Sequence, residues 1–157
     1  MTDIWPSPPI IVPEQVKQLI TRFFDISDST DPDSGSSFAE ELFTKDGYFK
    51  THRTCIFRGH DEIASSRPSN LPIIAYRKHH FIKIYTNDCP ATDLLVLGNF
   101  EIGFKTGSVL LLDFTARFVV DTEEGKLRSV EVFSDGGESK EAFEEAMRGW
   151  DERKGGK

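Results

Sequence analysis

A histidine at position 80 lies in a segment whose alternate residues are largely apolar, and histidine is the side chain best suited to proton transfer near neutral pH. Residues 75–88 predict a β-strand, whose successive side chains point to opposite faces. One face then carries Tyr76, Lys78, His80, Ile82 and Ile84, and we expect it to point inward. Burial there would keep the imidazole of His80 neutral and able to act as a general base.

The same test applies to two further long β-type segments, residues 93–121 and 126–135. Their predicted inner faces are apolar and supply most of the expected lining of a ligand pocket: Phe100, Ile102, Phe114, Ala116, Val130 and Val132. The outer face mixes leucine and phenylalanine with Glu101, Arg117 and Glu131. Such a mixture favours a homodimer interface, and the alternative is an ordinary exposed sheet face.

Helices are predicted mainly before these strands. Residues 13–27 carry an apolar stripe at helical spacing, and shorter helices are expected over 36–43 and from residue 60 to near Pro68. We therefore expect a Pro-rich arm at 1–12, one α+β domain at 13–136 with a curved antiparallel sheet around three N-terminal helices, and a short helix with a frayed tail at 137–157.

Composition and net charge limit the classes of ligand and the location that we expect. The 157 residues are 38% hydrophobic, which suffices for one core, and the net charge of −7 opposes a nucleic-acid role and favours an uncharged or weakly basic ligand. No apolar window is long enough to predict a membrane span, and no signal-peptide pattern occurs, so we expect a cytoplasmic protein.

The cysteines and the remaining motifs indicate no cofactor. Cys55 and Cys89 are expected to be free thiols; His52 and His60 leave a nucleophilic Cys55 as an alternative to a half-buried strand residue. No metal-ligand spacing and no phosphate-binding loop is present, so neither a metal nor another cofactor is expected.

The order of three helices and then long strands, with a G-x-x-x-I motif at 59–63 and the turn E-E-G-K-L at 123–127, resembles the nuclear transport factor 2-like superfamily. The nearest branch is similar to the SnoaL-like polyketide cyclases, especially the fungal ones. This resemblance implies a cone-shaped, cystatin-like α+β barrel with a deep apolar cavity. It also implies a homodimer formed by the outer sheet face.

The catalytic residues of the related branches are compared with this sequence one position at a time. The segment His79-His80-Phe81 matches the Q-H-F context of the scytalone dehydratase branch, which places His80 in the pocket. Phe24-Asp25 replaces the Tyr-Asp pair of that branch, so Asp25 is expected to orient the imidazole of His80. Arg58 and Tyr48 belong to the segment that runs along the cavity entrance in this fold, and Tyr76 shares the predicted face of His80; we expect all three to bind ligand.

Other branches of the superfamily fit less well. The second histidine of scytalone dehydratase is absent, and the strand aspartate of ketosteroid isomerase is replaced by Ala116. The epoxide-hydrolase branch uses an Asp-Arg-Asp set, and Glu101 and Glu131 lie in the relevant strands. Parity directs both outward, although a one-residue register shift would reverse this. We expect a cofactor-independent lyase, isomerase or cyclase for an apolar polyketide- or terpenoid-like metabolite. The alternative is a non-catalytic ligand-binding or dimerisation module.

Overall fold

The computed structural model describes residues 4–67 and 71–155, which form one α+β unit. The predicted order of helices and strands is confirmed, and the predicted bounds of the first two helices are within one residue. The described elements are α1 (Glu14–Asp28), α2 (Gly35–Leu42), β1 (Phe43–His52), β2 (Cys55–Arg58), α3 (Gly59–Ser65), a 3-10 turn (Leu71–Ile73), β3 (Ile74–Thr86), β4 (Asp93–Phe104), β5 (Val109–Asp121), β6 (Lys126–Ser134) and α4 (Gly136–Gly155).

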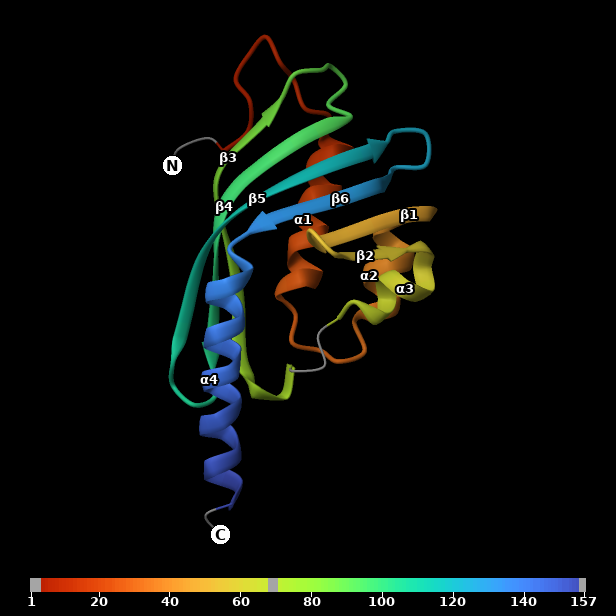
Figure 1. Ribbon diagram of the computed structural model, residues 1–157. Coiled ribbons are helices and arrows are strands. Elements are labelled where there is room, and N and C mark those ends of the chain that lie inside the picture. The colour runs from red at the N-terminus through yellow and green to blue at the C-terminus, as the bar shows by residue number, and fades with distance from the viewer. Residues whose placement is uncertain (1–3, 68–70, 156–157) are drawn as a thin grey trace.

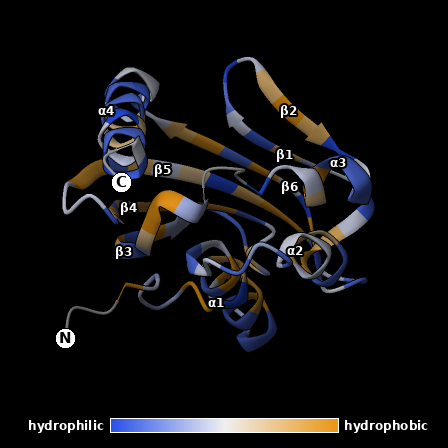
Figure 2. Ribbon diagram, turned by 90° about the horizontal axis from the view of Figure 1, so that it is seen from below, coloured by the Kyte–Doolittle hydropathy of each residue, from blue (hydrophilic) through white to orange (hydrophobic). Residues whose placement is uncertain are grey.

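The six strands form one curved, open sheet in the order β2-β1-β6-β5-β4-β3. Neighbouring strands are antiparallel except β1 and β6, which run parallel, so the prediction of an antiparallel sheet holds for four of the five pairings. Figure 1 shows the long strands bending along their length, and Figure 2 shows the sheet arching over α1 and α2. The predicted cone with its helices on the concave face is confirmed.

Aromatic side chains fill the core between α1 and the sheet. Phe23 on α1 lies 5.0 Å from Phe118 on β5 and 5.2 Å from Phe38 on α2, measured between ring centroids. The helix presents Val16, Leu19, Ile20, Phe23 and Phe24 to this core, as its apolar stripe predicts. Large buried rings of this kind contribute most of the apolar area removed from water.

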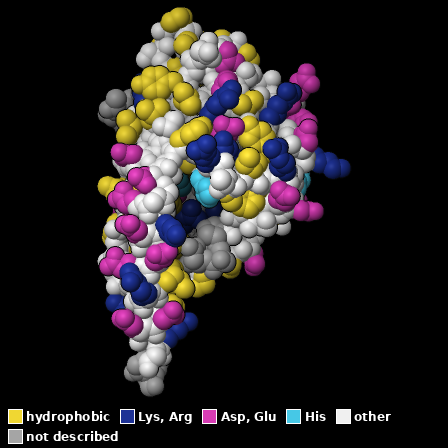
Figure 3. All heavy atoms as spheres, viewed as in Figure 1, with side chains coloured by type: hydrophobic (Ala, Val, Ile, Leu, Met, Phe, Trp, Pro, Cys, Tyr) yellow, Lys and Arg dark blue, Asp and Glu magenta, His cyan; other side chains and the backbone are white. Residues whose placement is uncertain are grey.

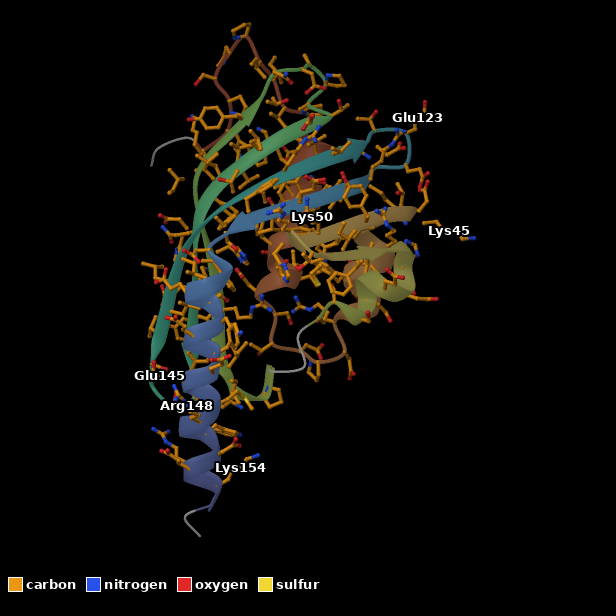
Figure 4. The ribbon with its side chains drawn as sticks, viewed as in Figure 1. Lys45, Lys50, Glu123, Glu145, Arg148 and Lys154 are labelled. Atoms are coloured by element: carbon orange, nitrogen blue, oxygen red, sulfur yellow. The ribbon has the colours of Figure 1, made fainter. Side chains whose placement is uncertain are left out.

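The helix α4 packs at the other end of the sheet. It is 20 residues long, and Ala146 is buried against a second apolar cluster formed by β3, β4 and β5. Glu145, Arg148 and Lys154 are exposed on the sides of α4 that face away from this cluster (Figure 4). The helix α3 ends at Ser65, and its predicted end near Pro68 lies outside the described residues.

Parity predicts the inner faces of three strands correctly and fails on the fourth. On β4, β5 and β6 the predicted inner residues are buried or line a cavity. On β3 the residues that point inward between positions 76 and 81 are Arg77, His79 and Phe81. The predicted inward orientation is therefore wrong for four exposed residues: Tyr76, Lys78, His80 and Ile82.

Two irregularities in the pairing of β3 with β4 explain this correction. Phe81 pairs with Gly98 and Lys83 pairs with Leu97, which leaves Ile82 as an extra residue; a similar shift lies between Ile74 and Tyr76. A β-bulge adds one residue to one strand and thereby exchanges the faces of the residues that follow. Ile74 and Ile84 point inward, and the stretch between the two bulges has the opposite phase.

Candidate functional site

A cavity of about 350 Å³ lies between the concave face of the sheet and the helices. Its walls are mainly aromatic and aliphatic, with two guanidinium groups, one imidazole and several hydroxyls among them. Figure 3 shows a hollow beside α4 in which histidine and basic side chains come to the surface. Residues from α1, α2, β1, β3, β4, β5, β6 and α4 contribute to the lining.

The imidazole of His79 is fixed by a carboxylate from α1. Its Nδ1 lies 2.5 Å from Oδ1 of Asp28, and Oδ2 of Asp28 accepts the backbone N–H of His79 at 3.1 Å. The ring stacks on Phe100 with centroids 4.4 Å apart and also contacts Phe24. Nδ1 therefore carries the proton that it donates to Asp28, and Nε2 forms no hydrogen bond to any described residue.

Burial and the ion pair set the protonation states of these two groups. Burial lowers the pKa of His79 below its usual value, and the opposing attraction of Asp28 is the smaller effect. Partial burial raises the pKa of Asp28, but the hydrogen bonds from His79 together with its attraction outweigh burial and leave that pKa below its usual value. At neutral pH the pair is thus a neutral imidazole beside a carboxylate.

Two arginines give the cavity a positive wall. Arg67 donates to Oγ of Ser34 and to the carbonyl oxygens of Ser27 and Ser29, at 3.0, 3.4 and 2.7 Å. The guanidinium carbon of Arg77 lies 5.3 Å from the ring centroid of Phe100. Its Nε and Nη1 atoms are buried without a hydrogen-bond partner among the described residues. Burial lowers the pKa of Arg77 to about 10, so it remains protonated at neutral pH.

Five of the predicted apolar ligand contacts line the cavity: Phe100, Ile102, Phe114, Ala116 and Val132. Val130 is fully buried in the core and does not line the cavity. Tyr48 donates its hydroxyl to Glu131 at 2.7 Å on the outer face of the sheet, and Arg58 stacks over the ring of Tyr48. Tyr76 is 43% exposed and bonded to Glu101, so it also lies outside the cavity.

The predicted catalytic pair is not brought together. His80 points outward with 46% of its side chain exposed, compared with 13% for His79, and its Nε2 lies 3.5 Å from Glu101. Asp25 is exposed on α1. The catalytic roles assigned to His80 and Asp25 stay untested predictions, but the imidazole that lines the cavity is that of His79, and the carboxylate bound to it is that of Asp28.

One of the residues that the sequence analysis missed, Asp28, carries a partial signal in the sequence. Asp28 follows Phe24 by four positions, so both lie on one helix face, and Phe24 was expected to point inward. This spacing favours Asp28 over Asp25 as the carboxylate that reaches the cavity imidazole. His79 and Arg77 share one strand face, but only the bulge at Ile82 shows that this face is the inner one.

No family model and no curated protein matches this chain. Solved structures do match it. A protein from Shewanella denitrificans OS-217 that is described as a SnoaL-like polyketide cyclase superposes with a TM-score of 0.66 at 10% identity, covering 85% of this chain and 99% of its own. PrhC from Penicillium brasilianum NBRC 6234 has a TM-score of 0.66 at 14% identity, covering 88% and 95%.

A third neighbour is a hypothetical protein from Catenulispora acidiphila DSM 44928 with a ketosteroid isomerase-like fold, solved with trimethylamine. It has a TM-score of 0.60 at 14% identity, covering 78% of this chain and 86% of its own. These likenesses show that this chain shares the fold of these proteins. Since the neighbours come from bacteria and from a fungus, they do not support a specifically fungal branch. None of the described helices is long and apolar enough to cross a membrane.

Proposed function

We propose that this protein binds a small, largely apolar metabolite and catalyses a cofactor-independent proton transfer on it, as a lyase, isomerase or cyclase. The observation that carries the proposal is the Asp28–His79 pair, whose Nε2 has no partner among the described residues, in a cavity walled by phenylalanines. A titratable pair in the main apolar cavity is the usual arrangement of a proton-transfer site.

The proposed reaction follows from the tautomer of His79, which carries its proton on Nδ1 and leaves Nε2 free to accept one. Neutral His79 accepts a proton from carbon at Nε2, and the C–H electron pair moves into an adjacent carbonyl to form an enolate. Asp28 holds Nδ1–H and stabilises the imidazolium that forms, and Arg77 offers a positive charge to the developing oxyanion. Returning the same proton to another carbon completes an isomerisation, whereas loss of a β-substituent completes an elimination.

A binding module without catalysis is the second candidate. It is favoured because neither Tyr48 nor Tyr76 lines the cavity, so the phenol donors expected there do not contribute an acid. Ligand binding requires only the apolar walls and the guanidinium groups, whereas catalysis also requires His79 to act as a base.

Deuterium exchange separates the two candidates. The protein is incubated with 2-tetralone in D₂O, and the loss of the α-proton signals is followed by NMR. The matched variants are His79→Gln and His80→Gln, which change neighbouring imidazoles on opposite faces of β3. We expect the wild type and His80→Gln to accelerate exchange and His79→Gln to lose about 100-fold of that acceleration. Binding of 2-tetralone without any acceleration would favour the binding module.

The proposal extends to assembly and location. A homodimer through the outer sheet face is supported by exposed Leu95, Leu111 and Phe133 beside the Arg117–Asp93 ion pair. A cytoplasmic location is supported by the two cysteines, Cys55 and Cys89, which are both free.

A further inference from the structure

Stabilising an enolate does not by itself explain why two nitrogens of the Arg77 guanidinium lack hydrogen-bond acceptors among the described residues of the free protein. Its side chain extends from β3 into the cavity, and its Nε and Nη1 atoms are shielded from solvent with no acceptor among the described residues. Phe100 lies against its guanidinium face and accepts no hydrogen bond. A buried guanidinium that lacks acceptors is costly, because its desolvation is not repaid by hydrogen bonds.

The neighbouring groups of the cavity leave this charge uncompensated. Both carboxylate oxygens of Asp28 are engaged by His79, and Asp28 acts on Arg77 only through longer-range attraction. Arg67 adds a second positive charge whose partners are a hydroxyl and two backbone carbonyls, all of them neutral. Two guanidinium groups thus line the cavity and no described carboxylate does, although Asp28 attracts both of them and Asp31 attracts Arg67 at longer range.

We propose that the ligand is an apolar carboxylic acid whose carboxylate binds Arg77, and this inference rests on the proposed ligand-binding role of the cavity but not on catalysis. A carboxylate supplies the two acceptors and the negative charge that the guanidinium lacks. The phenylalanines of α1, β1, β4 and β5 would then surround the apolar body of the ligand.

The position of Arg77 also sets the distance between the proposed ligand carboxylate and the proposed base, His79. Arg77 and His79 stand two residues apart on one strand face, which separates their backbone positions by about 6–7 Å. Both side chains lie against Phe100. A carboxylate held at Arg77 therefore places carbons a few bonds away within reach of Nε2 of His79.

A pair of probes that differ only in charge tests this inference. Binding of 2-naphthoate and of 2-naphthamide is measured by isothermal titration calorimetry on the wild type, on Arg77→Met, and on the control Lys78→Met, which changes the next residue on the outer face. We expect the wild type and Lys78→Met to prefer the carboxylate, and Arg77→Met to lose about 10- to 100-fold of affinity for it while keeping its affinity for the amide.

The stability of Arg77→Met provides a second readout. If Arg77 had only a structural role, the substitution would destabilise the protein. Because the charge is uncompensated in the free protein, Arg77→Met should unfold at the same or a higher urea concentration than the wild type. Equal binding of the two probes by the wild type would overturn the inference and leave the ligand cavity standing. So would unchanged naphthoate affinity in Arg77→Met, or clear destabilisation of that variant. Failure of both probes to bind the wild type would count against the ligand-binding role as well.

Discussion

The chemistry proposed for the cavity depends on one imidazole whose two nitrogens meet different surroundings. Nδ1 of His79 is bound to Asp28, and Nε2 has no partner among the described residues. The neighbouring imidazole of His80 is exposed beside Glu101. These two adjacent histidines thus have different environments, because successive side chains of a strand point to opposite faces and only one of these faces is shielded from solvent.

Replacing Asp28 with asparagine should lower the pKa of His79 further. Burial already depresses this pKa, and Asp28 is the group that opposes the depression by stabilising the imidazolium. The Asp28→Asn variant leaves the burial in place and removes the stabilising charge, so the titration midpoint falls. The measurement is a pH titration of the His79 ring nitrogens by NMR, with Asp25→Asn as the control.

An unchanged or raised midpoint in Asp28→Asn would contradict this account of the pair. Asp25 is exposed on the same helix, so Asp25→Asn should leave the titration of His79 where it is in the wild type. Because the pKa of His79 lies below its usual value, the base form persists at mildly acidic pH and is lost only as the pH falls through that lowered pKa.

At the scale of elements, β3 decides which residues reach the cavity. Its bulges at Ala75 and Ile82 reverse the faces of the residues between them. In contrast, β4 and β5 keep a simple alternation along their inner faces, and β6 does so from Val130 onward, after an irregularity near Arg128. The sequence predicted those three strands because alternation of apolar residues reports burial directly. It could not predict the phase of β3, since a bulge depends on pairing with β4 and leaves no pattern in β3 itself.

Gly98 is the position on β4 where close packing against β3 can be tested. A Cβ there would lie 2.4 Å from the carbonyl oxygen of His80 and 2.8 Å from the ring of Phe114. The Gly98→Ala variant should therefore lose about 1–3 kcal/mol of the free energy of unfolding, measured by urea denaturation.

Gly149 on α4 supplies the matched control for that substitution. Its nearest neighbour to an added Cβ is the methyl group of Thr106 at 3.4 Å, an ordinary contact. Gly149→Ala should be neutral or stabilising by up to about 1 kcal/mol, because alanine favours a helix. If Gly98→Ala were as stable as the wild type, the close contact between β3 and β4 would be wrong.

At the scale of the whole molecule, the fold is predictable and the electrostatics of the cavity are not. Helical spacing and strand parity predict a curved sheet around N-terminal helices, the resemblance implies a cone, and the structure confirms both. The net charge of −7 favoured an uncharged or weakly basic ligand, yet Arg67 and Arg77 make the cavity wall positive. Bulk charge averages over the surface and carries no information on two side chains that the fold brings together.

The proposed homodimer is tested at the same scale by sedimentation of Arg117→Glu. Arg117 pairs with Asp93 on the outer face, with Nη2 and Oδ2 2.6 Å apart, so the substitution places two negative charges where an ion pair stood. We expect the wild type to sediment as a dimer and Arg117→Glu as a monomer. Lys154→Glu, on the exposed side of α4, should remain dimeric (Figure 4). A dimeric Arg117→Glu would exclude this face as the interface.

The most direct measurement of the central claim compares the deuterium exchange of 2-tetralone by His79→Gln and His80→Gln. Both substitutions remove one imidazole from β3, and only His79 lines the cavity beside Asp28. We expect His80→Gln to exchange at the rate of the wild type and His79→Gln to be slower by about 100-fold. Equal rates in the two variants, or a loss confined to His80→Gln, would contradict the assignment of the base to His79.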